Sequence, residues 1–191
     1  MRHILLADIF GFTGALQALA DQLPGDWQII DPYDGAEQNF QDEAQAYACF
    51  QKVSGVDIYA RQLSNCLAQA DNERVNVVGF SVGASALWQV LASDMAGRIN
   101  IAVGFYGNQI RHALDSEPRC PVTLVLPESE IHFSVPELAA SLIRYPQVKL
   151  QHSADLHGFM NPASVNYSAV GYAEYRDWLH SLLSNRAGPQ A

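Results

Sequence analysis

Short apolar runs alternate along this chain with longer stretches that have helical periodicity. Most of the runs are continuous in hydrophobicity, as in strands that are covered on both faces. The alternation predicts an α/β fold with a doubly wound, parallel sheet of about six strands. The predicted strands span residues 3–8, 27–31, 75–80, 99–105, 122–127 and 148–152. The predicted helices span residues 14–23, 41–51, 56–70, 84–95, 136–144 and 165–183.

The length and charge of the chain restrict its organisation and its partners. At 191 residues it is expected to form one domain over residues 1–185, followed by a short flexible tail over 186–191. Twenty acidic residues against 11 basic ones give a net charge of −9, and no Lys/Arg cluster occurs. This balance excludes a nucleic-acid footprint and opposes binding to anionic membranes. The sequence does not indicate an oligomeric state.

The cysteines and the apolar segments predict where the protein is located. Three scattered cysteines favour neither a disulfide framework nor a zinc site, and they fit a reducing compartment. Asp8 interrupts the first apolar run too early for a signal peptide, and no uncharged run is long enough to span a membrane. We therefore expect a soluble, cytoplasmic protein without a metal or an organic cofactor.

The segment "NVVGFSVGAS", residues 76–85, places Ser81 between two glycines, directly after a predicted strand and before a predicted helix. A nucleophile elbow, G-x-S-x-G, requires this context. Gly79 and Gly83 lack a Cβ, so the strand and the helix can approach closely around the serine. The amino terminus of the helix would direct amide groups at a developing oxyanion. The pattern predicts that Ser81 is a nucleophile. No phosphate-binding glycine motif occurs here.

A serine nucleophile needs a base, and the base needs an acid to orient it. His157 follows the last predicted strand, at the sheet edge where ligands bind in such folds, and His132 is a weaker alternative. Glu128 and Glu130 both follow the fifth strand and precede His157, in the order Ser, acid, His. We favour Glu130, although Glu128 remains open.

The second oxyanion amide is expected from the loop after the first strand, "ADIFGFTG". Ile9 would supply this N–H group and Val82 the other. Asp8 would then lie near the serine, although it is almost as readily explained as a cap for the following helix. Phe10, Tyr106 and Phe159 are further expected to line the site.

Several segments together resemble the dienelactone hydrolase family. They run in order from residue 3 to about residue 183, and they are "LLADIFGFTGAL", "DPYDG", "VVGFSVGAS", "AVGFYG", "IHFSVP" and "HGFMNP". The resemblance implies an α/β-hydrolase fold with little or no lid. It places the nucleophile at Ser81, the base at His157 and the acid at Glu130, with Ile9 and Val82 as oxyanion donors. The family typically has a cysteine nucleophile, so serine here points to an esterase-like mechanism.

Two functions are therefore considered. The first is a serine hydrolase that cleaves a small ester, lactone or thioester through an acyl-enzyme on Ser81. The alternative is a catalytically silent binding or regulatory protein with the same fold. The sequence does not identify the substrate.

Overall fold

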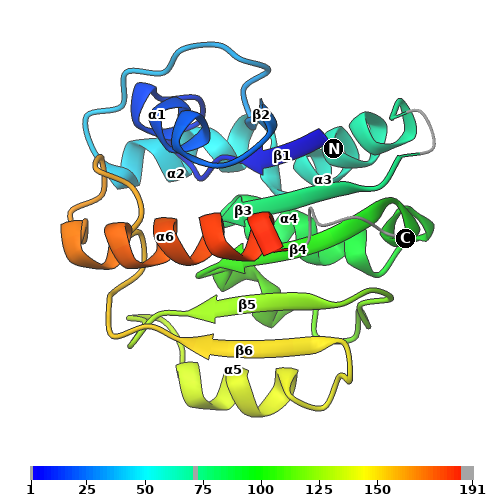
Figure 1. Ribbon diagram of the computed structural model, residues 1–191. Helices are drawn as coiled ribbons and strands as arrows, with labels where there is room; N and C mark the ends of the chain where they lie inside the picture. Colours follow the sequence, from blue (N-terminus) through cyan, green and yellow to red (C-terminus); the bar gives the residue numbers. More distant parts are fainter. Residues whose placement is uncertain (1, 71–72, 186–191) are drawn as a thin grey trace.

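The computed structural model describes residues 2–70 and 73–185. The described strands form one parallel sheet of six, in the order β2-β1-β3-β4-β5-β6 (Figure 1). This confirms the predicted fold class. The strands are β1 (Arg2–Leu6), β2 (Asp26–Ile30), β3 (Val75–Phe80), β4 (Ile99–Phe105), β5 (Val122–Leu126) and β6 (Val148–His152).

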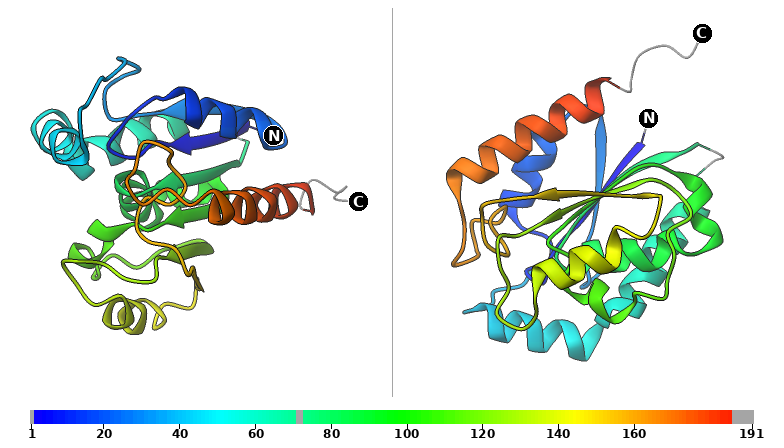
Figure 2. Two further views of the ribbon diagram at one scale, coloured as in Figure 1. Left: turned by 90° about the vertical axis from the view of Figure 1, so that its left-hand side faces the viewer. Right: turned by 90° about the horizontal axis from the view of Figure 1, so that it is seen from below.

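Helices cover both faces of the sheet. The right-hand view of Figure 2 shows this with the sheet seen edge-on. The first and last helices, α1 (Gly14–Gln22) and α6 (Ala169–Asn185), pack on one face with a core cluster that includes Leu19, Phe105 and Leu179. The other face carries α2 (Glu43–Val53), α3 (Gly55–Ala68), α4 (Val82–Leu91) and α5 (Val135–Leu142). This arrangement explains the continuous hydrophobicity of the central strands, because both of their faces are buried.

The strand order reverses between β1 and β3, because β1 is followed along the chain by β2 on one side while β3 lies on its other side. Leu6 at the end of β1 is paired with Gly79 near the end of β3. A crevice forms at such a switch point, outside the carboxyl ends of the strands. The arrowheads of β1 and β3 point to the left-hand side of Figure 1. Residues that follow β1 and β3 are therefore brought together there.

The predicted elements agree with the structure in order and type, but several helix and strand ends differ. The first strand, for example, ends at Leu6 instead of residue 8. The fourth helix begins at Val82, directly after Ser81, instead of residue 84, and it is followed by the 3₁₀ turn η1 (Asp94–Arg98). The last helix begins at Ala169 instead of residue 165, because the Ser168 side chain accepts a hydrogen bond from the Gly171 amide and ends the preceding loop. A second 3₁₀ turn, η2 (Asn108–His112), follows β4. The predicted tail, residues 186–191, lies outside the described residues.

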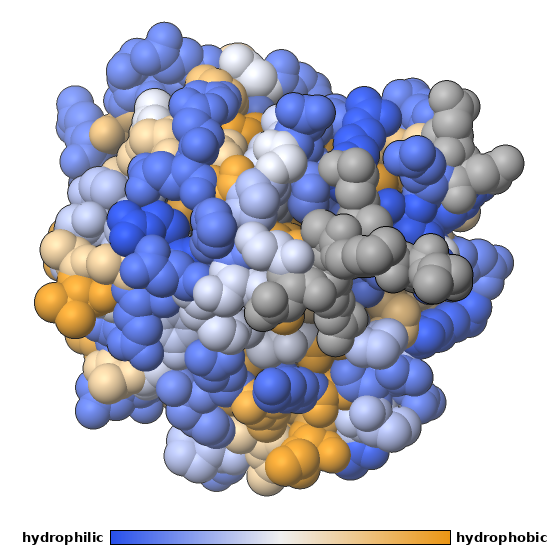
Figure 3. Space-filling view, viewed as in Figure 1, coloured by the Kyte–Doolittle hydropathy of each residue, from blue (hydrophilic) through white to orange (hydrophobic). Residues whose placement is uncertain are grey.

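The surface seen in Figure 3 is largely hydrophilic. Apolar atoms gather at its left margin, near the start of α6, and at its lower margin, near the end of α5. Exposed apolar side chains in these parts of the chain include Val170 and Ile143. Within residues 2–70 and 73–185, no helix combines the length and hydrophobicity needed to cross a membrane.

Candidate active site

Ser81 occupies a strained turn between β3 and α4. Its backbone has φ 52° and ψ −111°, and its amide donates to Phe105 O at 2.9 Å. A positive φ is costly for a residue with a Cβ, so the surrounding structure has to hold it in place. Ser81 is the N-cap of α4, yet its hydroxyl makes no capping hydrogen bond. The hydroxyl is therefore available to a partner outside the helix.

The two glycines around Ser81 permit the close contact between β1, β3 and α4. A Cβ at Gly83 would lie 2.6 Å from Ala7 O and 2.7 Å from Leu6 O in the neighbouring strand segment. A Cβ at Gly79 would lie 2.8 Å from the Ala84 amide nitrogen. The atoms that a Cβ would meet belong to the backbone, which cannot rotate away as a flexible side chain can. The glycines thus set the position of the helix relative to the serine.

This contact predicts a large difference between two glycine substitutions. Gly83→Ala is expected to destabilise the fold by about 1–3 kcal/mol, because the added methyl group overlaps the β1 backbone. Gly97→Ala is the matched control, since a Cβ at this exposed position in η1 meets no atom within 4 Å. Chemical unfolding of both variants measures the difference. Equal stabilities would contradict the close contact.

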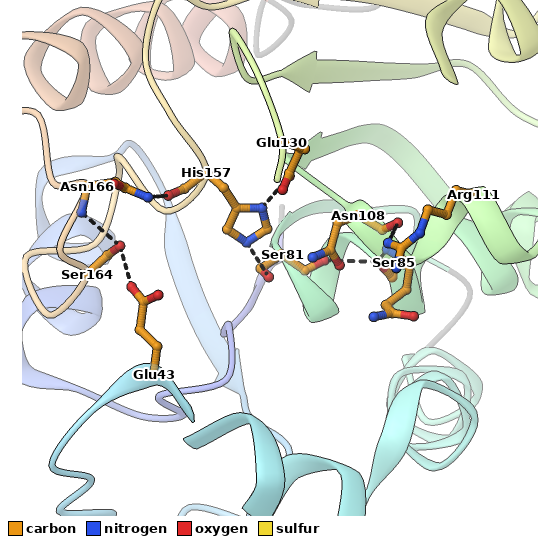
Figure 4. A network of polar contacts seen from close by, with 10 residues as sticks. Glu43, Ser81, Ser85, Asn108, Arg111, Glu130, His157, Ser164 and Asn166 are labelled. Carbon is orange, nitrogen blue, oxygen red and sulfur yellow. Dashed lines mark hydrogen bonds and ion pairs between the residues drawn. The ribbon is translucent and has the colours of Figure 1, made fainter. Parts of the chain in front are cut away.

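The structure brings Ser81, His157 and Glu130 into one hydrogen-bonded chain (Figure 4). Ser81 Oγ lies 2.9 Å from His157 Nε2, and His157 Nδ1 lies 2.7 Å from Glu130 Oε1. The Glu130 side chain is only 9% exposed. Glu128, the alternative acid, is exposed on the same loop, and His132 lines the cavity without a described bond to Ser81. Such a chain allows the histidine to accept the serine proton while the carboxylate stabilises the imidazolium.

The β1–α1 loop contributes Ile9 to the same site. The amides of Phe10 and Gly11 donate to Asp8, to Oδ1 at 2.9 Å and to the carbonyl oxygen at 3.1 Å. The described residues offer no acceptor to the Ile9 amide, while Ile9 O accepts from Tyr33 Oη at 2.6 Å. Val82 is the first residue of α4, so its amide has no acceptor within the helix. Ile9 and Val82 both line the cavity that contains Ser81.

Asp8 is a buried carboxylate at the end of this cavity. It is 8% exposed, and burial is the main cause that raises its pKa above the ordinary value of 3.8. Hydrogen bonds from Asn161 and Phe10 and the charge of His157 lower the pKa, whereas the charge of Glu43 raises it further. The proton is therefore held more tightly in the folded protein than in the unfolded chain.

The raised pKa of Asp8 predicts how stability depends on pH. In the folded state the carboxyl keeps its proton to higher pH, so its contribution is present below pH 3.8 and is lost as pH rises through the folded pKa. Relative to Asp8→Asn, the wild type should lose up to about 1.4 kcal/mol of unfolding free energy per pH unit within this window. Urea unfolding at a series of pH values measures this difference. A difference that is flat, or that rises with pH, would contradict the assignment.

The loop that carries His157, between β6 and α6, is held to α2 by polar contacts (Figure 4). Asn166 Nδ2 donates to His157 O at 2.9 Å, and the Asn166 amide donates to Ser164 Oγ at 3.3 Å. Ser164 Oγ in turn donates to Glu43 Oε1 at 2.7 Å. The backbone of His157 is thus fixed by residues that lie outside the Ser81 chain.

A cavity of about 460 Å³ opens over Ser81, a volume suited to a small organic molecule. Asp8, Phe10 and Tyr106 are among the residues that line it. A hollow of about 590 Å³ lies elsewhere, next to the amino end of β6, and neither Ser81 nor His157 lines it. We therefore assign the site to the smaller cavity, because it contains the paired serine and histidine.

The structure differs from the prediction at Phe159, which was expected to line the site. This side chain is fully buried, and its ring packs 5.5 Å from Tyr106 and 5.2 Å from Tyr175 between centroids. Phe159 belongs to the core cluster between the sheet and α6. The chain reverses at Gly158, which has φ 89°, and the residue after it is buried in the core.

Other contacts at the site have no signal in the sequence. Asn161 Nδ2 donates to Asp8 Oδ2 at 2.6 Å, and Glu43 accepts from Ser164. These pairs are separated by more than a hundred residues, and neither belongs to a short motif. Arg111 lines the cavity as well, with its guanidinium carbon 4.9 Å from the centroid of the Phe133 ring.

Comparisons with known proteins identify the family. Residues 7–183 match the dienelactone hydrolase family. The uncharacterized protein YczH of Bacillus subtilis (strain 168) is 32% identical over 130 residues, which is 67% of this chain. The match spans 63% of that relative's own length.

Solved structures share the fold at low sequence identity. A dienelactone hydrolase-like promiscuous phosphotriesterase from metagenomic libraries has a TM-score of 0.68 at 14% identity. The alignment covers 96% of this chain and 85% of that protein's chain. A cold-adapted esterase from an Arctic intertidal metagenomic library has a TM-score of 0.60 at 18% identity, and the alignment covers 94% of this chain and 82% of the esterase chain. The dienelactone hydrolase of Anabaena variabilis has a TM-score of 0.60 at 14% identity, and the alignment covers 93% of this chain and 83% of that hydrolase chain. With its six-stranded parallel sheet and a family match over nearly its whole length, this chain belongs to the dienelactone hydrolase family.

Proposed function

We propose that this protein is a serine hydrolase that cleaves a small ester, lactone or thioester through an acyl-enzyme on Ser81. The observation that carries the proposal is the contact of 2.9 Å between Ser81 Oγ and His157 Nε2, continued by the 2.7 Å contact of His157 with Glu130. A serine hydroxyl is a weak nucleophile until a base accepts its proton. The contact supplies that base.

In the first step, His157 Nε2 accepts the proton of Ser81 as Oγ forms a bond to the carbonyl carbon of the substrate. The carbonyl oxygen becomes an oxyanion, which the amides of Ile9 and Val82 stabilise. The imidazolium then donates its proton to the leaving alcohol or thiol, and the bond to the leaving group breaks. Glu130, through its bond to Nδ1, stabilises the positive charge on His157.

In the second step, water takes the place of the leaving group. His157 accepts a proton from the water molecule while its oxygen attacks the acyl carbon. Collapse of this second oxyanion breaks the bond to Ser81 Oγ, which recovers its proton from His157. The carboxylic acid is released, and the enzyme returns to its first state.

The size of the cavity supports a small substrate. A volume of about 460 Å³ accommodates a small acyl or alcohol group. Apolar side chains such as Ile9, Phe10 and Leu156 form part of its wall beside polar ones such as Gln109 and Asn166. The proposal includes lactones and thioesters of small acids alongside simple esters, because the same attack on a carbonyl carbon cleaves all three.

The test combines covalent labelling with turnover. A fluorophosphonate probe is expected to label the wild-type protein at Ser81, as located by peptide mass spectrometry, and a panel of small esters, lactones and thioesters is expected to include a substrate. Turnover without labelling at Ser81 would reject this mechanism. Absence of both labelling and turnover would favour the catalytically silent alternative.

A further inference from the structure

Two loops from distant parts of the chain have to keep a fixed distance for the proposed reaction to work. The β1–α1 loop carries the Ile9 amide, and the β6–α6 loop carries His157. These loops are joined directly by one side-chain hydrogen bond, in which Asn161 Nδ2 donates to Asp8 Oδ2 at 2.6 Å. The bond connects the loop of the oxyanion amide to the loop of the base.

Each partner is also fixed within its own loop. Asp8 Oδ1 accepts from the Phe10 amide, and Asp8 O accepts from the Gly11 amide. Asn161 Oδ1 accepts from the Ala163 amide at 2.9 Å, so its Nδ2 is the group that faces Asp8. The Asn161 amide donates to Gly158 O, next to His157. The link between Asp8 and Asn161 therefore joins two locally constrained turns.

The use of a carboxylate here is costly for stability. Asp8 is buried, its hydrogen-bond donors are two amide groups, and none of the ion pairs among the described residues includes it. A neutral side chain at this position could cap the turn without the cost of burying an ionisable group. If the hydrogen bond served only to stabilise the fold, a carboxyl group at position 8 would offer no advantage over a neutral side chain. Residues with such a cost concentrate at functional sites.

We propose that Asp8 and Asn161 form a positioning pair that keeps the Ile9 amide aligned with Ser81 and His157 during catalysis. This inference rests on the proposed function. Both residues act through the loops that they join, and the reacting atoms remain those of Ser81, His157 and the substrate. A pair of this kind affects the transition state more than substrate binding, so its loss should lower kcat and leave KM nearly unchanged.

The experiment reverses the direction of the hydrogen bond. Asp8→Asn places two amide donors face to face, and Asn161→Asp places two carboxyl groups face to face. Each single variant is expected to lower kcat by about 10- to 100-fold, because small displacements of catalytic groups cost this much. In the double variant D8N/N161D the new amide at position 8 can donate to the new carboxylate at position 161. The local bonds to Phe10 and Ala163 remain available, so the double variant should recover most of the lost kcat.

Titration of active sites separates positioning from folding. The fluorophosphonate probe, allowed to react to completion, counts the competent sites, and kcat is expressed per titrated site. A purely structural role would reduce the number of sites and leave kcat per site unchanged. Asn65→Ala, at an exposed position in α3, is the control variant and should match the wild type.

Three outcomes decide the inference. Lower kcat per site in both single variants, with recovery in the double variant, supports it. Unchanged kcat per site, or a double variant no better than the single ones, overturns it while the proposed function stands. A wild type that neither reacts with the probe nor turns over an ester rejects the proposed function, and the inference is rejected with it.

Discussion

Ser81→Ala is expected to lower kcat/KM for any ester substrate by at least about 10,000-fold, which is the scale of loss when a serine nucleophile is removed. The variant lacks the oxygen that forms the acyl-enzyme, whereas the oxyanion amides and the cavity remain. Binding of substrate should therefore change little. Covalent labelling by a fluorophosphonate should disappear, and the melting temperature should stay close to that of the wild type or rise, because alanine leaves the strained turn in place.

The control for this prediction is Ser181→Ala, which removes an exposed hydroxyl from α6. It should retain wild-type turnover and labelling. Hydrolysis by Ser81→Ala at more than about a hundredth of the wild-type rate would be incompatible with an acyl-enzyme on this residue. Both variants can be measured with the best ester of the panel, after each preparation has been checked for folding by circular dichroism.

The second large effect is expected at Glu130. Glu130→Gln keeps the size of the side chain but removes the charge that stabilises the imidazolium of His157. The amide also permits a hydrogen bond to Nδ1 from its NH₂ group, which favours the wrong tautomer of the histidine. Loss of an orienting carboxylate in such a triad costs about 10³- to 10⁴-fold in kcat. Steady-state kinetics with the same ester measures the loss.

Glu128→Gln is the matched control, because Glu128 lies two residues away on the same loop and is exposed. We expect it to retain nearly the full kcat of the wild type. The opposite order of effects would assign the acid to Glu128 and would require the loop after β5 to rearrange. Equal and small effects would mean that His157 needs no carboxylate partner in this protein.

The sheet and the principal site residues could be predicted from the sequence because they depend on local patterns. Continuous apolar runs locate the strands, and the carboxyl ends of parallel strands meet at one edge. Ser81 follows β3 directly and His157 lies in the loop after β6, so the topology alone places them on the same side of the sheet. For the acid, the sequence favours Glu130 but leaves Glu128 open, because both residues follow β5 and the sequence does not reveal the course of the loop.

The contacts that the sequence did not predict are tertiary. Phe159 follows the base closely, yet the turn at Gly158 leaves it in the core against α6. The Asp8–Asn161 and Glu43–Ser164 bonds join segments whose separation in sequence exceeds any motif. Polar side chains of this kind appear in every loop, and only the packing of the loops decides which of them meet.

The order of the strands has a consequence for the time at which the protein can become active during its synthesis. Ile9, whose amide is the proposed oxyanion donor, leaves the ribosome first. Ser81 follows after β3, and the proposed base, His157, arrives only after β6, an edge strand of the sheet. A nascent chain that ends before residue 157 lacks the proposed base. While the ribosome adds residues 82–156, the growing polypeptide therefore contains the proposed nucleophile without the imidazole that would activate it.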